Sequence, residues 1–330
     1  MTQGTVIALT SYGAAAAAIS DPKWDKLGIE GMWGFGLRQF ARLALGLLGA
    51  FLLAGAVAAL PAGTHLDLSA YLAGWLAHLQ AIARLDFGKS QVTALPAAVE
   101  LARRLPVTLE LVGAGALVAL VLGVPLGLLL GTGRRLRAAA PLVQIVAAAP
   151  VFCAGLGLLW LADHVLGWQV ARHPGAAWWA QAAAGHALDP EALLRALALP
   201  ALTVGAAGAA AVQLSLRRAA SMAIEAPYRQ GLRLMGLGSF EIDRAYIAPQ
   251  IVAGFLTNLG EITLALFSAA AVAEWVFGWP GAAVLFVKSI ALEDWSVAAL
   301  ILLVFASIKL AADFAGAVSA RALARGEGAS

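Results

Sequence analysis

The sequence predicts an all-α integral membrane protein with six transmembrane helices. Of its 330 residues, 61% are hydrophobic and only 12% are charged, and the mean hydropathy is +0.83. Soluble domains are nearer half apolar and carry about 25% charged residues, so this composition excludes an ordinary soluble domain. Six apolar segments have the length of about 20 residues that a ~30 Å hydrocarbon core requires of a helix. They are residues 40–60, 107–130, 142–162, 196–216, 250–273 and 297–316.

The residues before the first apolar segment are predicted to form an N-terminal cytoplasmic extension, residues 1–38. The apolar stretch 6–19 is too short to cross a membrane, and it lacks the basic start and the cleavage site of a signal peptide. A helix lying at the membrane interface is the expectation for it. We therefore expect three regions: the extension 1–38, a transmembrane domain 39–320 and a cytoplasmic tail 321–330.

The distribution of Lys and Arg predicts that both termini are cytoplasmic (N-in/C-in). With that orientation the inner segments carry fourteen of these residues and the outer segments carry seven. Cytoplasmic loops of membrane proteins are enriched in Lys and Arg, so the two-to-one bias favours this orientation. It also places a polar segment, residues 217–249, on the cytoplasmic side.

Residues 217–249 are the one long polar stretch between two apolar segments in the C-terminal half of the chain. They hold five Arg and three acidic residues, which cannot lie in hydrocarbon. Pro227 can open a helix at its first turn, and Gly236 with Gly238 supplies a turn that tolerates positive φ. Ser239 is expected to cap the next helix. The pattern therefore predicts a helix, a glycine turn and a second helix.

This loop resembles the coupling loop of binding-protein-dependent ABC importer permeases. That loop reads Glu-Ala-Ala, three residues, Gly, nine residues, Ile-x-Leu-Pro; here the Gly and the Pro are matched by Gly236 and Pro249, and the Glu-Ala-Ala is not matched. The dipeptide/oligopeptide/nickel branch has Tyr-Val-Arg-Thr-Ala-Arg-Ala-Lys-Gly-Leu, which residues 228–237 match at four positions but without the Lys. The resemblance implies that the loop docks on an ATPase through Tyr228, Arg229, Gln230, Arg233, Gly236, Leu237 and Pro249.

Motifs elsewhere resemble the same branch. Residues 104–111 match all seven specified positions of Arg-Leu-Pro-x-Thr-Leu-Glu-Leu, and residues 86–90 resemble its Gly-Asp-Phe-Gly-x-Ser. Residues 274–281 resemble Glu-x-Val-Phe-x-Trp-Pro-Gly, and residues 293–295 resemble Arg-Asp-Tyr. The resemblance implies the type I ABC importer permease fold. It also implies an outer-face gate or binding-protein contact at Asp86, Glu274, Trp279, Pro280, Gly281 and Asp294.

The resemblance also implies the partners. A second permease subunit, giving a heterodimer, would complete the pore in the bacterial inner membrane, two ATPase subunits would hold ATP and Mg, and a periplasmic binding protein would deliver the solute. The chain has no phosphate-binding Gly-Lys-Ser/Thr loop, no Cys or His spacing typical of a metal site, and one cysteine. We therefore predict no catalysis, cofactor, metal or nucleic-acid partner for this chain. The solute stays open among peptides, nickel chelates, haem, opines and sugars.

Ionisable residues inside the predicted spans are candidates for the transport path. Glu261 falls near the middle of the span 250–273, on one helical face with Asn258 and continuing to Ser268. A carboxylate there either lines a wet path or hydrogen bonds to another helix, and the sequence leaves both open. Lys309 and Asp313 are four residues apart and are expected to form a local ion pair. The alternatives to an ABC permease are an ion- or proton-coupled secondary carrier using Glu261 and a membrane scaffold without transport.

Overall fold

A computed structural model of the chain describes residues 30–60, 68–133, 140–168, 178, 181, 184–185 and 190–326. The chain divides into two units, residues 1–44 and residues 45–330. In the first unit the described part is the beginning of helix α2, which runs over Glu30–Ala58. The predicted interfacial helix 6–19 lies outside the described residues. The boundaries predicted at residues 38 and 320 stay predictions.

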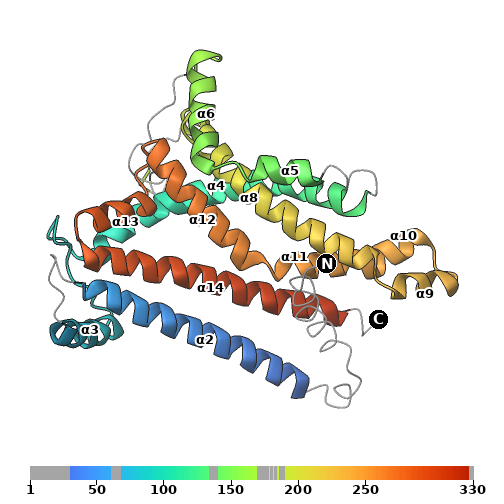
Figure 1. The fold of residues 1–330 in the computed structure, drawn as a ribbon, viewed down its shortest axis with the longest axis horizontal. Coiled ribbons are helices and arrows are strands. Elements are labelled where there is room, and N and C mark those ends of the chain that lie inside the picture. Colours follow the sequence, from blue (N-terminus) through green and yellow to red (C-terminus); the bar gives the residue numbers. More distant parts are fainter. Residues whose placement is uncertain are drawn as a thin grey trace, which may run out of the picture. The chain divides into compact units, whose positions relative to one another are not determined.

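The described residues are mainly helical, and strand pairing among them is limited to one isolated bridge between Lys89 and Pro96. Figure 1 labels the helices. After α2 they are α3 (Leu68–Ala83), α4 (Ala97–Thr132), α5 (Ala140–Ala147), α6 (Val151–His164), α8 (Pro190–Ile224), α9 (Tyr228–Leu234), α10 (Ser239–Ile242), the π-helix η3 (Asp243–Ile247), α11 (Ala248–Leu256), α12 (Leu259–Val276), α13 (Ala282–Ala291) and α14 (Trp295–Gly326).

Five helices in the described part of the chain are long and apolar enough to cross a membrane: α2, α4, α8, α12 and α14. They cover five of the six predicted spans, so the all-α multi-pass fold is confirmed. The third predicted span, 142–162, is instead two short helices, α5 and α6, with Pro150 as the N-cap of α6. A proline disfavours helical backbone at the residue before it, which explains the interruption.

The fifth predicted span is also interrupted, between α11 and α12. Asn258 has φ −103° and ψ 11° and stands before the first residue of α12. The side chains of Thr257 and Asn258 both donate to the carbonyl oxygen of Gly254, at 2.8 Å. Such side-chain bonds to backbone carbonyls compete with the regular helix ladder. The 250–273 segment is therefore a short helix followed by a spanning helix, and not one continuous span.

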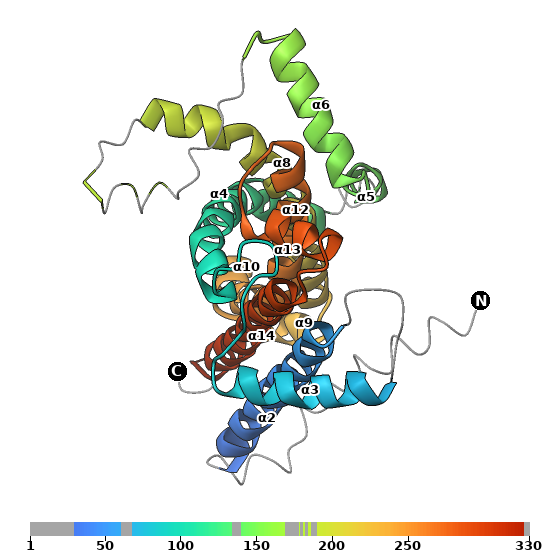
Figure 2. The same cartoon turned by 90° about the vertical axis from the view of Figure 1, so that its left-hand side faces the viewer.

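Helices α4 and α8 make the most extensive contact among the described helices, and Figures 1 and 2 show them side by side. Glycines four residues apart on α4 face residues four apart on α8. A Cβ added to these glycines would lie 2.8, 2.8 and 2.6 Å from the facing Cβ atoms, closer than real Cβ contacts. The pairs are Gly123 with Val212, Gly127 with Leu216, and Gly131 with Ala220. Small residues at this seam allow the two helices to pack closely, as is common for helices in lipid.

Helix α3 lies between α2 and α4 in the chain. It is held against α2 by two side chains that reach backbone carbonyls. The Tyr71 hydroxyl donates to Ala56 O and the Trp75 indole donates to Leu52 O, both at 3.1 Å. These bonds satisfy the polar ends of two amphipathic aromatic side chains.

Candidate functional site

The polar segment 217–249 has the predicted helix, turn and helix. Helix α8 continues to Ile224, α9 follows, and Gly236 takes the left-handed conformation with φ +87° at the turn before α10. Only glycine adopts this φ without a steric penalty, so the residue type at 236 is explained by the backbone. The capping role predicted for Ser239 is wrong. Gly238 is the N-cap of α10, and no side chain caps that helix.

One face of this loop is anchored to the helix bundle. Ile242 and Ile247 are buried in the main hydrophobic core, and Leu232 and Leu237 pack against the same core. Arg229 on α9 donates to Asp243 at 2.8 Å, which joins the two sides of the turn. Apolar anchoring on one side and an ion pair across the turn hold the loop in a defined conformation.

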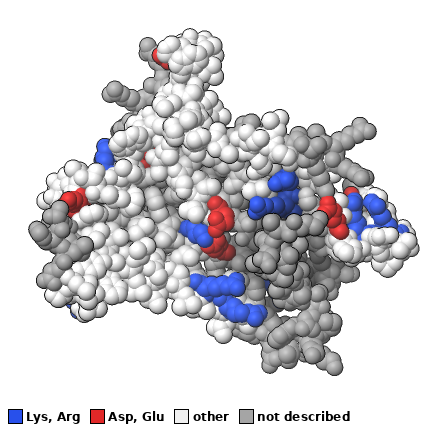
Figure 3. Space-filling model, viewed as in Figure 1, with Lys and Arg blue, Asp and Glu red and all other residues white. Residues whose placement is uncertain are grey.

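The other face of the loop presents large apolar side chains to solvent. Leu234, Met235 and Phe240 are 83%, 71% and 78% exposed. They lie at the end of α9, just after it and in α10, and Figure 3 shows basic and acidic side chains at this end and a second group near the middle of the same face. Exposed apolar side chains surrounded by charge mark protein interaction sites. The loop therefore has the chemistry of a docking surface.

The predicted coupling residues differ in how exposed they are in this loop. Tyr228, Gln230, Arg233 and Gly236 are exposed, Arg229 is in the ion pair, and Leu237 and Pro249 are partly buried. Sequence reasoning missed Leu234, Met235, Phe240 and the ion-pair partner Asp243. Large apolar residues in the middle of a polar segment were the available signal for the first three.

The motifs at 104–111 and 274–281 meet in one buried hydrogen-bond network. The Thr108 hydroxyl donates to Glu274 Oε1 at 2.5 Å and accepts from the backbone N–H of Ala282 at 2.7 Å. The second carboxylate oxygen of Glu274 accepts from the N–H of Val284 at 2.7 Å. Thr108 and Glu274 are both fully buried. Together they satisfy the free N–H groups at the start of α13, as caps of a helix N-terminus do.

Trp279 and Gly281 complete this network. The Trp279 indole donates to Val107 O at 3.2 Å, and the side chain is 2% exposed. A Cβ added to Gly281 would collide with the Glu274 carboxylate and the Thr108 hydroxyl, so only glycine fits there. Pro280 and Gly281 lie in the break between α12, which ends at Val276, and α13, which starts at Ala282.

A second network joins the loop before α4 to the start of α14. The Ser90 hydroxyl donates to Asp294 Oδ2 and accepts from the backbone N–H groups of Val92 and Thr93 at 3.2 and 3.1 Å. Asp86 accepts from Gly88 N–H at 3.0 Å and is exposed. Thus Glu274, Trp279 and Asp294 are buried and join segments that are distant in sequence, whereas Asp86 is exposed.

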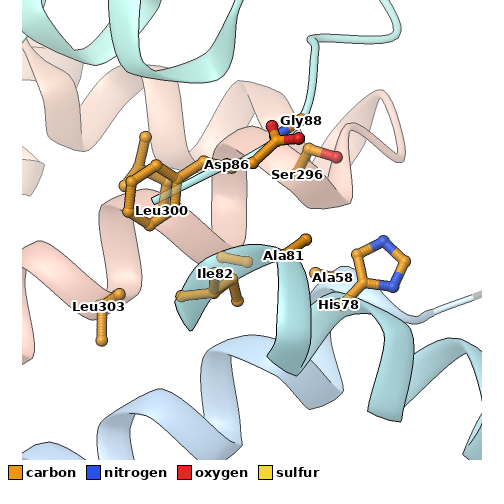
Figure 4. A pocket seen from close by; sticks show the side chains of 11 residues that line it. Ala58, His78, Ala81, Ile82, Asp86, Gly88, Ser296, Leu300 and Leu303 are labelled. Carbon is orange, nitrogen blue, oxygen red and sulfur yellow. The ribbon is translucent and has the colours of Figure 1, made fainter. Parts of the chain in front are cut away.

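A cavity of about 140 Å³ lies beside this second network. Figure 4 shows Asp86, Gly88 and Ser296 at one part of it and Leu300, Ile82 and Leu303 at another, with His78 contributed by α3. The polar groups are grouped at one end and the rest of the lining is apolar. This volume is small beside the several hundred Å³ typical of ligand pockets, so we assign it no solute.

The predicted path residues are on or next to α12. Glu261 is in the first turn of α12 and not in the middle of a continuous helix. Lys309 on α14 pairs with Asp313 at 2.6 Å, as expected from their spacing, and its Nζ also lies 3.5 Å from Glu261 Oε1. Ser268 lines a groove that α12 shares with α2, α13 and α14, and Asn258 is hydrogen bonded within its own segment.

Comparison with known proteins agrees with this architecture. The family described as "Binding-protein-dependent transport system inner membrane component" matches residues 123–326. The chain is 30% identical over 234 residues to the probable D,D-dipeptide transport system permease protein DdpB of Escherichia coli (strain K12). That alignment covers 64% of this chain and 66% of the relative, just under two thirds of its length.

A further relative is the putrescine export system permease protein SapB of Escherichia coli (strain K12), 24% identical over 240 residues, which are 67% of this chain and 74% of that protein. The peptide transport system permease protein SapB of Escherichia coli O157:H7 matches over the same share. The family match spans more than half of the chain and includes the polar loop, α12 and α14. The chain therefore belongs to the family of inner membrane components of binding-protein-dependent transport systems.

Proposed function

We propose that this chain is the permease subunit of an ATP-driven ABC importer in the bacterial inner membrane. It forms half of the translocation path for a peptide or a similar small solute. The geometry of the loop 217–249 is the observation that carries this proposal. An anchored turn with an exposed apolar tip is suited to transmit movement from a docked partner, because its inner face is fixed to the bundle.

The partners follow from this role. Two separate ATPase subunits, which hold ATP and Mg, dock on the loop through Tyr228, Arg229, Gln230, Arg233, Gly236, Leu237 and Pro249. A second permease, giving a heterodimer, completes the path, and a periplasmic binding protein delivers the solute to the outer face. Asp86 and Pro280 are the accessible members of the predicted outer-face set, so they are the proposed contacts.

A peptide is the solute class that the relatives favour. One relative is named for D,D-dipeptide transport and another for peptide transport. A third is named for putrescine export, so both the solute and the direction of transport differ among relatives. The family membership disfavours a secondary carrier that uses Glu261 as its coupling group, and it equally disfavours a scaffold without transport.

Two substitutions in the loop test the proposal. Gly236→Trp forces a bulky residue into a left-handed backbone conformation, and Arg233→Glu reverses an exposed charge on α9. Both variants are expected to insert into the membrane but to lose the coupling of ATP hydrolysis to uptake. The measurement is binding-protein-stimulated ATPase and solute uptake in proteoliposomes.

Arg103→Glu is the matched control, because Arg103 is also exposed but lies on α4, outside the loop. It should leave coupling unchanged. Uptake at the wild-type rate with both loop variants would rule out this docking surface.

A further inference from the structure

An apolar groove of about 570 Å³ runs between α12, α13, α14 and the part of α2 after residue 45. This volume is in the range of sites for small organic ligands. Phe267, Phe286 and Phe305 contribute aromatic rings to its lining. Thr263, Ser268 and Lys309 are the polar residues that line it, and Lys309 brings the groove next to Glu261. The groove thus combines an apolar body with an ionic group near one end.

The ionic group lies too deep for a lipid headgroup. At 1.5 Å per residue, Lys309 is about 21 Å from the start of α14 at Trp295 and about 25 Å from its end at Gly326. The hydrocarbon core is only about 30 Å thick, so the group lies within it. The Glu261 side chain is nevertheless 68% exposed. An exposed carboxylate at this depth must face water or protein and not acyl chains.

The charges of the ionic group do not balance. Two carboxylates, Glu261 and Asp313, share the single ammonium of Lys309, which leaves a net charge of −1. Lys309 is hydrogen bonded to Asp313 at 2.6 Å, whereas its 3.5 Å separation from Glu261 is longer than a good hydrogen bond. Glu261 is therefore the carboxylate with capacity for a further cationic donor.

We propose that this groove binds the transported solute and selects one with a protonated amine next to an apolar group. The amine donates to Glu261, and the apolar group lies against the phenylalanine side chains. Asp313 keeps Lys309 neutralised, so that Lys309 does not repel the amine. This inference rests on the proposed transport function and adds the chemical class of the solute to it.

The test uses a cysteine in the groove as a reporter. Ser268 is exposed and lines the groove, and Cys153, the one native cysteine, lies on α6. In the full transporter in membrane vesicles, Ser268→Cys with Cys153→Ala is labelled with a small maleimide. The probes are phenylalaninamide, which carries an ammonium, and N-acetylphenylalaninamide, which is neutral and otherwise similar.

Phenylalaninamide is expected to slow labelling at a concentration about tenfold lower than the neutral probe, the factor typical of one charge-assisted hydrogen bond. Glu261→Gln should remove this difference, and Glu261→Asp should retain it. Asp163→Asn, a control for an exposed carboxylate on α6, should also retain it. Glu and Gln differ little in shape. If only Glu261→Gln removes the difference between the two probes, the charge of the Glu261 side chain is therefore what distinguishes them.

Equal slowing by both probes would overturn the amine selectivity. No slowing by either probe, or a cysteine that the maleimide never reaches, would show that the groove is covered by an acyl chain or by a helix of the second permease, and would overturn the inference. Coupling is measured in the same vesicles with Gly236→Trp. If the inference fails while Gly236→Trp still uncouples ATP hydrolysis, the proposed transport function stands without it.

Discussion

Replacing Thr108 by Val should destabilise the protein strongly, because the Thr108 hydroxyl is shared by two buried partners. Val has nearly the shape of Thr but lacks the oxygen that donates to Glu274 and accepts from Ala282 N–H. Both partners are buried, so neither can turn to water instead. The substitution therefore removes two hydrogen bonds and leaves two polar groups without these partners.

The magnitude follows from the number of groups affected. A buried polar group left unsatisfied costs about 1–3 kcal/mol, so two groups give a loss of about 2–6 kcal/mol in the free energy of unfolding. At roughly 2–4 °C per kcal/mol for a mid-sized domain, the Tm should fall by at least about 4 °C. The assay is thermal unfolding of the detergent-solubilised protein, followed by tryptophan fluorescence at one fixed scan rate.

Thr132→Val is the matched control. Thr132 is on the same helix, but it is exposed and its hydroxyl donates only to Leu128 O. Its replacement should change stability by less than about 0.5 kcal/mol. A double-mutant cycle with Glu274→Gln adds a second criterion, because residues in one network give non-additive effects. A Thr108→Val protein as stable as Thr132→Val, or strict additivity in the cycle, would refute the network.

Two further predictions concern the helix seam and the topology. Gly127→Ala should lower the Tm, because the added Cβ would lie 2.8 Å from Leu216 Cβ. Gly113→Ala on the same helix is the control, because a Cβ there meets nothing within 4 Å, and it should be neutral or stabilising. Equal Tm values for the two variants would contradict the close packing of α4 on α8. Cysteines at Ala94 and Gly278 should react with an impermeant reagent from outside, and those at Gly236 and Gly326 only from inside, in a Cys153→Ala background. Gly278 is suited as the outer reporter because it is exposed, unlike the neighbouring Trp279, and outside labelling of Gly236→Cys would disprove the orientation.

The overall fold was largely predictable because the bilayer imposes simple demands on sequence. A spanning helix needs about 20 apolar residues, and that alone locates α2, α4, α8, α12 and α14. The third and fifth spans were predicted as continuous because apolar content does not register backbone interruptions. The signals were present as Pro150, which starts α6, and as Thr257 with Asn258, whose side chains bond to Gly254. Interpreting them requires knowing which carbonyl each side chain reaches, and that depends on the fold.

The turn at Gly236 shows the other limit of sequence reasoning. Its positive φ could be predicted because glycine has few other reasons to occupy such a turn. The outward direction of Leu234, Met235 and Phe240 could not, because it depends on Ile242 and Ile247 being the side chains that the core accepts. Local chemistry fixes the turn, whereas the packing of the bundle decides which face of the turn remains for a partner.

Glu261 and Glu274 show why residue type and position in a span do not by themselves identify a functional carboxylate. Both are glutamates of α12, thirteen residues apart, and both are costly in hydrocarbon without partners. Glu274 is fully buried, and both of its oxygens accept from groups at the start of α13 or from Thr108, so its charge is already used in holding the fold. Glu261 is mostly exposed, and its nearest cation is 3.5 Å away and bound more closely by Asp313. Because a solute can only compete for acceptors that the protein leaves unfilled, the carboxylate with the weaker internal partners is the one that we propose for solute binding.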